Sequence, residues 1–153
     1  MKIQYKYLIL IIWMILIFLL SNEVANVSSG HSAVIVNAVL NSIHINLNES
    51  ILTFLIRKAA HIFMYFVLGA LMLNVVRAHK VSIKKAILLS IVFSLAYASF
   101  DEIHQLFIRG RSGELRDVII DITASIIGIG IFYVFYRIRL NHLNNKLACN
   151  ENK

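Results

Sequence analysis

Polar and ionisable side chains recur at helical spacing in three parts of the sequence, each beside a long apolar stretch. In the first part, Arg57, His61 and Tyr65 are four residues apart, so they share one face of a helix. The full set comprises Arg57, His61, Tyr65, Asp101, Glu102, His104, Gln105, Arg111, Asp117 and Asp121. If these groups converge, they could bind an anion or a metal ion, or they could transfer a proton.

Three functions are compatible with these residue types. In the first, the groups only hold helices together through ion pairs and hydrogen bonds. In the second, they form a pocket for an envelope component, with Asp101 and His104 as ligand contacts and Arg57 and Arg111 as anion binders. In the third, a histidine–carboxylate pair acts as a base or binds a metal.

We favour the binding function over an enzyme. The D-E-x-x-Q pattern that begins at Asp101 is not a zinc motif, and no nucleophile with an adjacent base stands out. The sequence therefore assigns no catalytic residue, and we expect neither a cofactor nor a bound metal. Transport would need several chains to assemble around a path, so a homo-oligomer stays open as an alternative.

The elements that carry these residues are predicted to be membrane-spanning helices. Hydrophobic residues make up 59% of the 153-residue chain and charged residues only 15%, whereas soluble domains average about 25% charged residues. The apolar stretches are residues 7–20, 59–76, 86–100 and 118–136. Since a span needs about 20 mostly apolar residues, we predict an all-α bundle with helices at about 5–21, 51–76, 86–107 and 117–137.

The remaining segments are predicted to flank this bundle. Residues 22–50 are rich in Asn and Ser, and a short amphipathic helix is expected among them. Residues 138–153 read as a polar, loosely ordered tail that follows a transmembrane domain over 1–137. The first apolar stretch follows Lys2 and Lys6 as in a signal peptide, but we expect it to be retained because no clean cleavage site follows.

The positive charges predict the orientation of the bundle. A net charge of +7 could indicate nucleic-acid binding, but most of the basic residues flank the apolar stretches on one side: Lys2, Lys6, Arg77, Lys80, Lys84, Lys85, Arg137, Arg139, Lys146 and Lys153. The positive-inside rule then places both termini and the 77–85 loop in the cytoplasm. The polar groups of all three helices fall at the opposite, outer end, which predicts an outward-facing pocket.

The same residues form an ordered set of motifs. R-K-x-A-H-x-x-x-Y-x-x-L-G begins at Arg57, D-E-x-H-Q-x-F begins at Asp101, G-R stands at 110–111, and D-V-x-x-D begins at Asp117. In this order they resemble the VanZ-like family of bacterial membrane proteins over roughly residues 8–137. The chain departs from the family pattern at Arg109, where proline is usual, and at Ala124, where glycine is common.

The resemblance implies a multi-pass protein of the bacterial plasma membrane. The founding member of the family is associated with low-level resistance to teicoplanin, a lipoglycopeptide antibiotic. The expected partners are therefore membrane lipid and a cell-wall precursor or lipoglycopeptide at the outer leaflet, and the expected function is to bind such a component. The resemblance brings no defined reaction with it.

Overall fold

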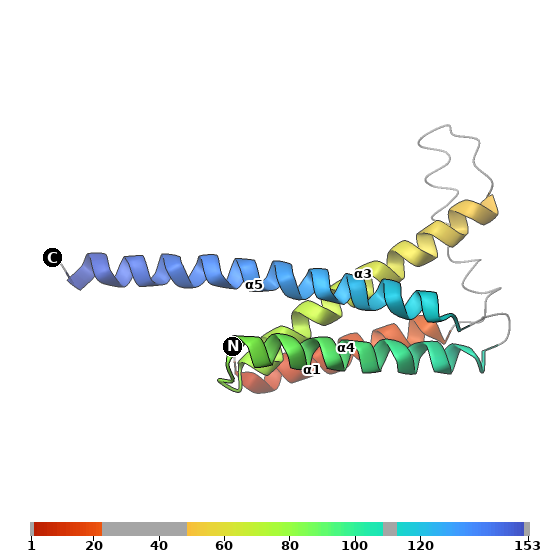
Figure 1. The fold of residues 1–153 in the computed structure, drawn as a ribbon, viewed down its shortest axis with the longest axis horizontal. Helices are drawn as coiled ribbons and strands as arrows, with labels where there is room; N and C mark the ends of the chain where they lie inside the picture. The colour runs from red at the N-terminus through yellow and green to blue at the C-terminus, as the bar shows by residue number, and fades with distance from the viewer. Residues whose placement is uncertain (1, 23–48, 109–112, 152–153) are drawn as a thin grey trace.

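The computed structural model describes residues 2–22, 49–108 and 113–151. Its helices are α1 (Ile3–Ser21), α3 (Glu49–Arg77), α4 (Ile83–Gln105) and α5 (Leu115–Glu151). The described part contains no strand, so the predicted all-α class is confirmed. Figure 1 shows α3 crossing α5 obliquely. Helix α4 packs against both α3 and α5, whereas α1 contacts mainly α3.

Each of these helices contains a stretch long and apolar enough to cross a membrane. The stretches are Ile3–Ser21, Phe54–Arg77, Ile83–Gln105 and Leu115–Leu147. Large apolar side chains such as Leu88, Val92 and Val134 cover the outside of the bundle, as expected of a surface that faces lipid. The four predicted spans are therefore confirmed, and the helices that contain them begin two to three residues before their predicted starts.

Helix α5 extends well beyond the end predicted for it. The sequence predicted a helix that stops near residue 137 and a loosely ordered tail, but the helix continues to Glu151. The physical reason is local: residues 138–151 contain neither glycine nor proline, so nothing there interrupts the helical hydrogen-bond ladder. In Figure 1 this part of α5 runs past the rest of the bundle.

Two glycines set the close contact between α3 and α5. A Cβ atom placed on Gly69 would lie 2.3 Å from the backbone oxygen of Ser125, and one on Gly128 would lie 1.9 Å from that of Phe66. Small residues let helix backbones approach in membranes, where packing and interhelical hydrogen bonds drive association. The Ser125 hydroxyl adds such a bond by donating to the Tyr65 carbonyl at 2.9 Å.

Helix α1 contacts the others through the buried side chains Leu10 and Ile17 and through hydrogen bonds to backbone carbonyl groups. The Trp13 indole donates to the Met64 carbonyl of α3 at 2.9 Å. The Tyr97 hydroxyl of α4 donates to the Met14 carbonyl of α1 at 2.7 Å. Only 11% of the α1 span is buried, against 39% for α3, so α1 contributes little to the interior.

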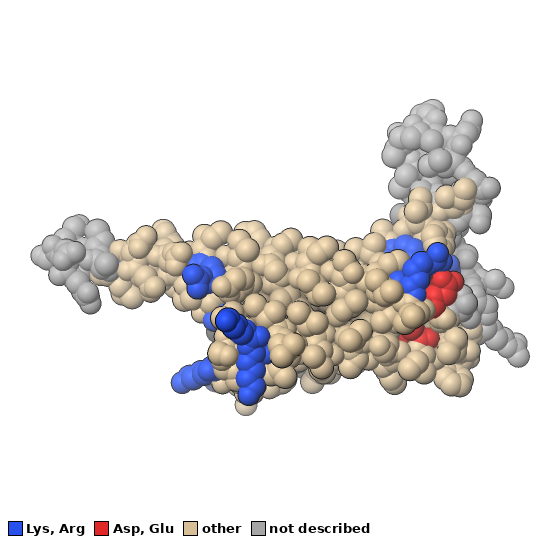
Figure 2. All heavy atoms as spheres, viewed as in Figure 1, with Lys and Arg blue, Asp and Glu red and all other residues tan. Residues whose placement is uncertain are grey.

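The bundle has two chemically different ends. The basic end carries the N-terminus of α1, the turn between α3 and α4, and the residues Lys2, Lys6, Arg77, Lys80, Lys84 and Lys85. The polar end carries the C-termini of α1 and α4 and the N-terminus of α5. Figure 2 shows basic side chains at the first end, and acidic and basic side chains together at the second.

Candidate functional site

Helices α3, α4 and α5 bring eight polar side chains together near the polar end, which we name the polar cluster. Its members are Lys58, His61, Tyr65, Asp101, Glu102, Gln105, Asp117 and Asp121. The helical stripes predicted from the sequence therefore do meet, since each of the three helices contributes its polar face. An ionisable side chain at membrane depth costs about 2.5–3.5 kcal/mol on insertion scales, so the cluster needs internal partners.

Asp101 lies at the centre of a hydrogen-bond network. Only 1% of the residue is exposed. Its Oδ2 accepts a hydrogen bond from the Tyr65 hydroxyl at 3.2 Å and a longer one from Gln105 Nε2 at 3.4 Å. Tyr65 is itself completely buried, so Asp101 and Tyr65 satisfy each other across the α3–α4 contact.

Glu102 joins α4 to the start of α5. Gln105 Nε2 donates to its Oε1 at 3.2 Å, and the backbone N–H of Glu114 donates to its Oε2 at 3.0 Å. Gly113 lies so close to α4 that a Cβ there would be 2.3 Å from the Glu102 carbonyl oxygen. The carboxylate thus holds the chain entering α5 against the end of α4.

His61 and Asp121 face each other across the α3–α5 contact. His61 Nδ1 lies 3.7 Å from Asp121 Oδ2, which is beyond hydrogen-bond distance. Asp121 is 1% exposed, and its Oδ2 has no hydrogen-bond partner. His61, Asp101 and Asp121 each offer one ligand atom, and these atoms all lie within 4.8 Å of one another. Within the described residues, these three could hold a metal ion.

Lys58 forms an ion pair with Asp117. The sequence predicted Arg57 and Arg111 as anion binders and did not include Lys58 among the site residues. Arg57 is half-buried on α3, one residue from Lys58, and Arg111 lies outside the described residues. The signal for Lys58 was present in its spacing, since 58, 61 and 65 follow the three- and four-residue steps of one helix face.

His104 contacts α1 and its own helix. Its ring stacks on Phe18 with centroids 4.7 Å apart and on Phe100 at 6.4 Å. Its Nε2 lies 3.2 Å from the Asn22 side-chain oxygen. His104 and Asp101 were predicted to contact one ligand together, but these contacts point His104 toward α1, whereas Asp101 points toward α3.

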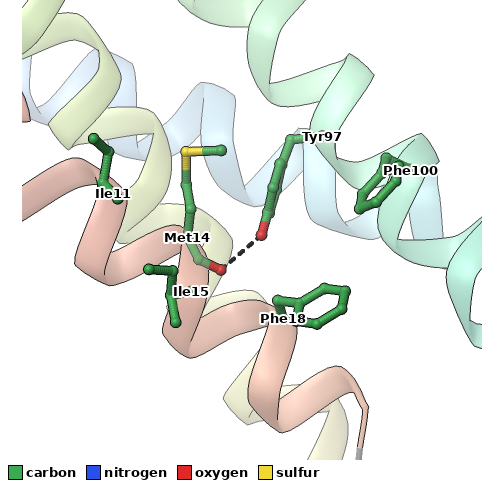
Figure 3. Close-up of a pocket in the computed structure, with 6 residues that line it drawn as sticks. All are labelled: Ile11, Met14, Ile15, Phe18, Tyr97 and Phe100. Atoms are coloured by element: carbon green, nitrogen blue, oxygen red, sulfur yellow. Dashed lines mark hydrogen bonds between the residues drawn. The ribbon is translucent and has the colours of Figure 1, made fainter.

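A hollow of about 360 Å³ lies between α1 and α4. Figure 3 shows the side chains that line it, which are Ile11, Met14, Ile15, Phe18, Tyr97 and Phe100. Its lining contains no ionisable group other than Tyr97, whose hydroxyl is bonded to the Met14 carbonyl. The hollow is thus chemically separate from the polar cluster, although Phe18 and Phe100 touch both it and His104.

The chemistry of the polar cluster is dominated by oxygen acceptors. It contains the carboxylates Asp101, Glu102, Asp117 and Asp121, and one lysine. Carboxylates accept hydrogen bonds and attract cations, so the cluster suits a hydroxyl, an ammonium group or a metal cation. A ligand that enters the polar cluster from the surface of the bundle would pass His61, Asp117 and Lys58, whose side chains are 20%, 14% and 23% exposed.

The comparisons with known proteins identify the family of the chain and nothing more specific. No curated protein and no solved structure matches the chain. The family model described as VanZ/LLP1 matches residues 6–136. This range includes most of α1, all of α3 and α4, the apolar part of α5 and every residue of the polar cluster. The resemblance seen in the sequence motifs is therefore confirmed: the chain belongs to the VanZ/LLP1 family of membrane proteins.

Proposed function

We propose that this chain is a binding protein of the bacterial plasma membrane whose polar cluster faces outward. Its ligand is an envelope component with hydroxyl or ammonium groups, such as a lipid headgroup, a cell-wall precursor or a lipoglycopeptide. By holding or shielding that component, the protein lowers susceptibility to lipoglycopeptides such as teicoplanin. Family membership supports the context, and the contacts of the cluster support the binding chemistry.

The observation that carries the proposal is the convergence of buried carboxylates from separate helices. A bundle that needed only packing could fill these positions with apolar side chains, because replacing a buried ionic group with apolar groups is often neutral or stabilising. Ionisable residues inside membrane spans usually mark a site that acts on something. Asp101 and Asp121, each 1% exposed, therefore favour binding over a purely structural role.

The outward orientation rests on the separation of the two ends. The basic end carries the loop between α3 and α4, and basic loops are retained in the cytoplasm. We expect cysteines introduced at Ser42 and Ser112 in a Cys149→Ser chain to react with an impermeant thiol reagent in intact cells. A cysteine at Ser82 should react only after permeabilisation. The reverse labelling would overturn the orientation.

The functional test is teicoplanin susceptibility in a sensitive bacterial host that makes matched membrane levels of each variant. We expect the intact chain to protect and Asp101→Ala not to. Ser90→Ala is a matched control, because Ser90 is a buried polar residue on the same helix whose hydroxyl bonds only its own helix, at the Ala86 carbonyl. Equal protection by Asp101→Ala would remove the cluster from the function, and no protection by the intact chain would remove drug resistance.

An enzyme acting on a lipid-linked envelope substrate is the second candidate. The facing pair His61 and Asp121, 3.7 Å apart, favours it, because a histidine beside a carboxylate can act as a general base. This alternative requires purified protein to turn over such a substrate and Asp101→Asn to abolish the turnover. Binding without turnover would favour the binding protein.

A further inference from the structure

The ligand atoms of His61, Asp101 and Asp121 form a compact mixed set of one imidazole nitrogen and two carboxylate oxygens. They come from three different helices and lie within 4.8 Å of one another. Ligands at about 2.0–2.1 Å from a tetrahedral Zn²⁺ lie roughly 3.3 Å apart. A contraction of this size is within reach of side-chain rotation, so the backbone geometry already suits a cation.

Asp121 supplies an independent observation. It is 1% exposed, and its Oδ2 has no hydrogen-bond partner although that oxygen points at His61 Nδ1, 3.7 Å away. Buried carboxylates are nearly always hydrogen-bonded, paired with a charge or bound to a metal. Asp121 Oδ2 therefore lies within ion-pair distance of His61 but accepts no hydrogen bond, and a cation between the two side chains would satisfy it.

The charge balance of the described residues points the same way. Lys58 pairs with Asp117. No Lys or Arg among the described residues lies within ion-pair distance of Asp101, Glu102 or Asp121. A divalent cation would offset two of these negative charges at once, which a neutral hydrogen-bond donor cannot do.

The surrounding groups hold the ligands in place. The Tyr65 hydroxyl bonds Asp101 Oδ2 at 3.2 Å, and Tyr65 is fixed in turn because Ser125 bonds its backbone carbonyl at 2.9 Å. Metal ligands are commonly oriented by such outer hydrogen bonds. His104, by contrast, is stacked on Phe18 and lies outside the group.

We propose that His61, Asp101 and Asp121 bind a first-row divalent cation, with Zn²⁺ as the favoured species. Imidazole selects such metals over Mg²⁺ and Ca²⁺, and three protein ligands leave one position of a tetrahedral site open. The sequence alone predicted no metal, because the three ligands are 40 and 20 residues apart and form no recognisable motif. The site goes beyond the proposed function, and it would stand even if the chain did not affect drug susceptibility.

The test measures metal on the purified full chain in detergent. Protein freed of metal with a chelator is incubated with Zn²⁺, desalted and analysed for zinc by mass spectrometry. We expect about one zinc per intact chain, and a tenfold or greater loss of retained zinc in His61→Gln and in Asp121→Asn. His104→Gln is the matched control, since it removes a histidine near the same end and should leave the zinc in place.

A thermal melt with and without chelator covers the case in which a variant folds poorly. If zinc is bound at this site, the chelator lowers the melting temperature of the intact chain and of His104→Gln, but not that of Asp121→Asn. Zinc retained equally by His61→Gln and Asp121→Asn would overturn the proposal. So would an intact chain that holds no more zinc than these variants.

Discussion

The two ends of the bundle satisfy their polar groups in different ways. At the basic end, cations contact a backbone carbonyl or an aromatic ring of another helix: Lys6 Nζ reaches the Asn74 carbonyl at 3.3 Å, and the Arg77 guanidinium lies 3.2 Å from the centroid of the Tyr136 ring, with its Nη1 buried and without a hydrogen-bond partner. In the polar cluster, buried carboxylates depend on side chains from other helices. Long basic side chains can reach water from a helix end, whereas short aspartates inside the bundle cannot.

This difference implies that sequence changes act differently at the two ends. An exposed side chain at the basic end, such as Tyr7, can be lost while its neighbours find water or lipid headgroups. A cluster side chain leaves a buried partner unsatisfied, which costs about 1–3 kcal/mol per orphaned group. The polar cluster is therefore the part of the molecule whose energetics depend on exact helix placement.

The largest expected effect comes from the glycine contact that fixes α3 against α5. Gly128→Ala places a Cβ 1.9 Å from the Phe66 carbonyl oxygen, where only the backbone could give way. We expect a loss of roughly 3 kcal/mol or more, at or beyond the upper end of ordinary overpacking, together with loss of the cluster geometry. The loss of stability is measured by unfolding the purified protein in mixed micelles.

Gly130→Ala is the control for this prediction. A Cβ at Gly130 would meet nothing within 4 Å, so the change should be neutral or stabilise the helix by up to about 1 kcal/mol. If the two alanine variants had the same stability, the close contact of α3 and α5 would not be what holds the cluster together.

An intermediate effect is expected when Asp101 loses its role as an acceptor. Asp101→Asn and Asp101→Leu both remove the charge, but only asparagine keeps an oxygen for the Tyr65 hydroxyl. We expect the leucine variant to be less stable than the asparagine variant by about 1–3 kcal/mol, measured in chelator. Identical stabilities would mean that the buried hydroxyl finds another partner and that the two ends differ less than we argue.

The smallest effect is expected at the basic end. The Tyr7 hydroxyl lies 2.5 Å from His79 Nε2, and both residues are exposed. Because water or a lipid headgroup can replace an exposed partner, we expect Tyr7→Phe to change stability by less than about 0.5 kcal/mol. A loss above 1.5 kcal/mol would show that the basic end also relies on specific side-chain pairs.

The membrane spans could be predicted because hydropathy alone sets them. The rotation of each helix about its own axis could not be predicted in the same way. Lipid is as apolar as a packed interior, so only polar residues indicate which face of a helix points inward. This sufficed for His61, Asp101 and Asp121. The pattern of polar residues did not distinguish Arg57 from Lys58, which differ by only 100° around α3. It also grouped His104 with Asp101, although stacking on Phe18 turns the histidine toward α1.

The extra length of α5 was missed for a related reason. Helix ends are predicted from capping residues, glycine or proline. The sequence after residue 137 contains no glycine or proline, and its asparagines do not end the helix before Glu151. The polar composition of residues 138–153 indicated a loosely ordered tail, although polarity alone does not prevent a helix. The predicted amphipathic helix within 22–50 falls almost wholly on residues that the structure does not describe, so it stays a prediction.

The close contact at Gly69 and Gly128 is also the point about which α3 and α5 can pivot. His61 is eight residues from Gly69 along α3, and Asp121 is seven residues from Gly128 along α5. With arms of roughly 12 and 10 Å, a change of about 5° in the crossing angle would move the two side chains by about 1 Å relative to each other. Helices tilt to match bilayer thickness, so a thinner or thicker membrane would tighten or loosen the polar cluster without any ligand.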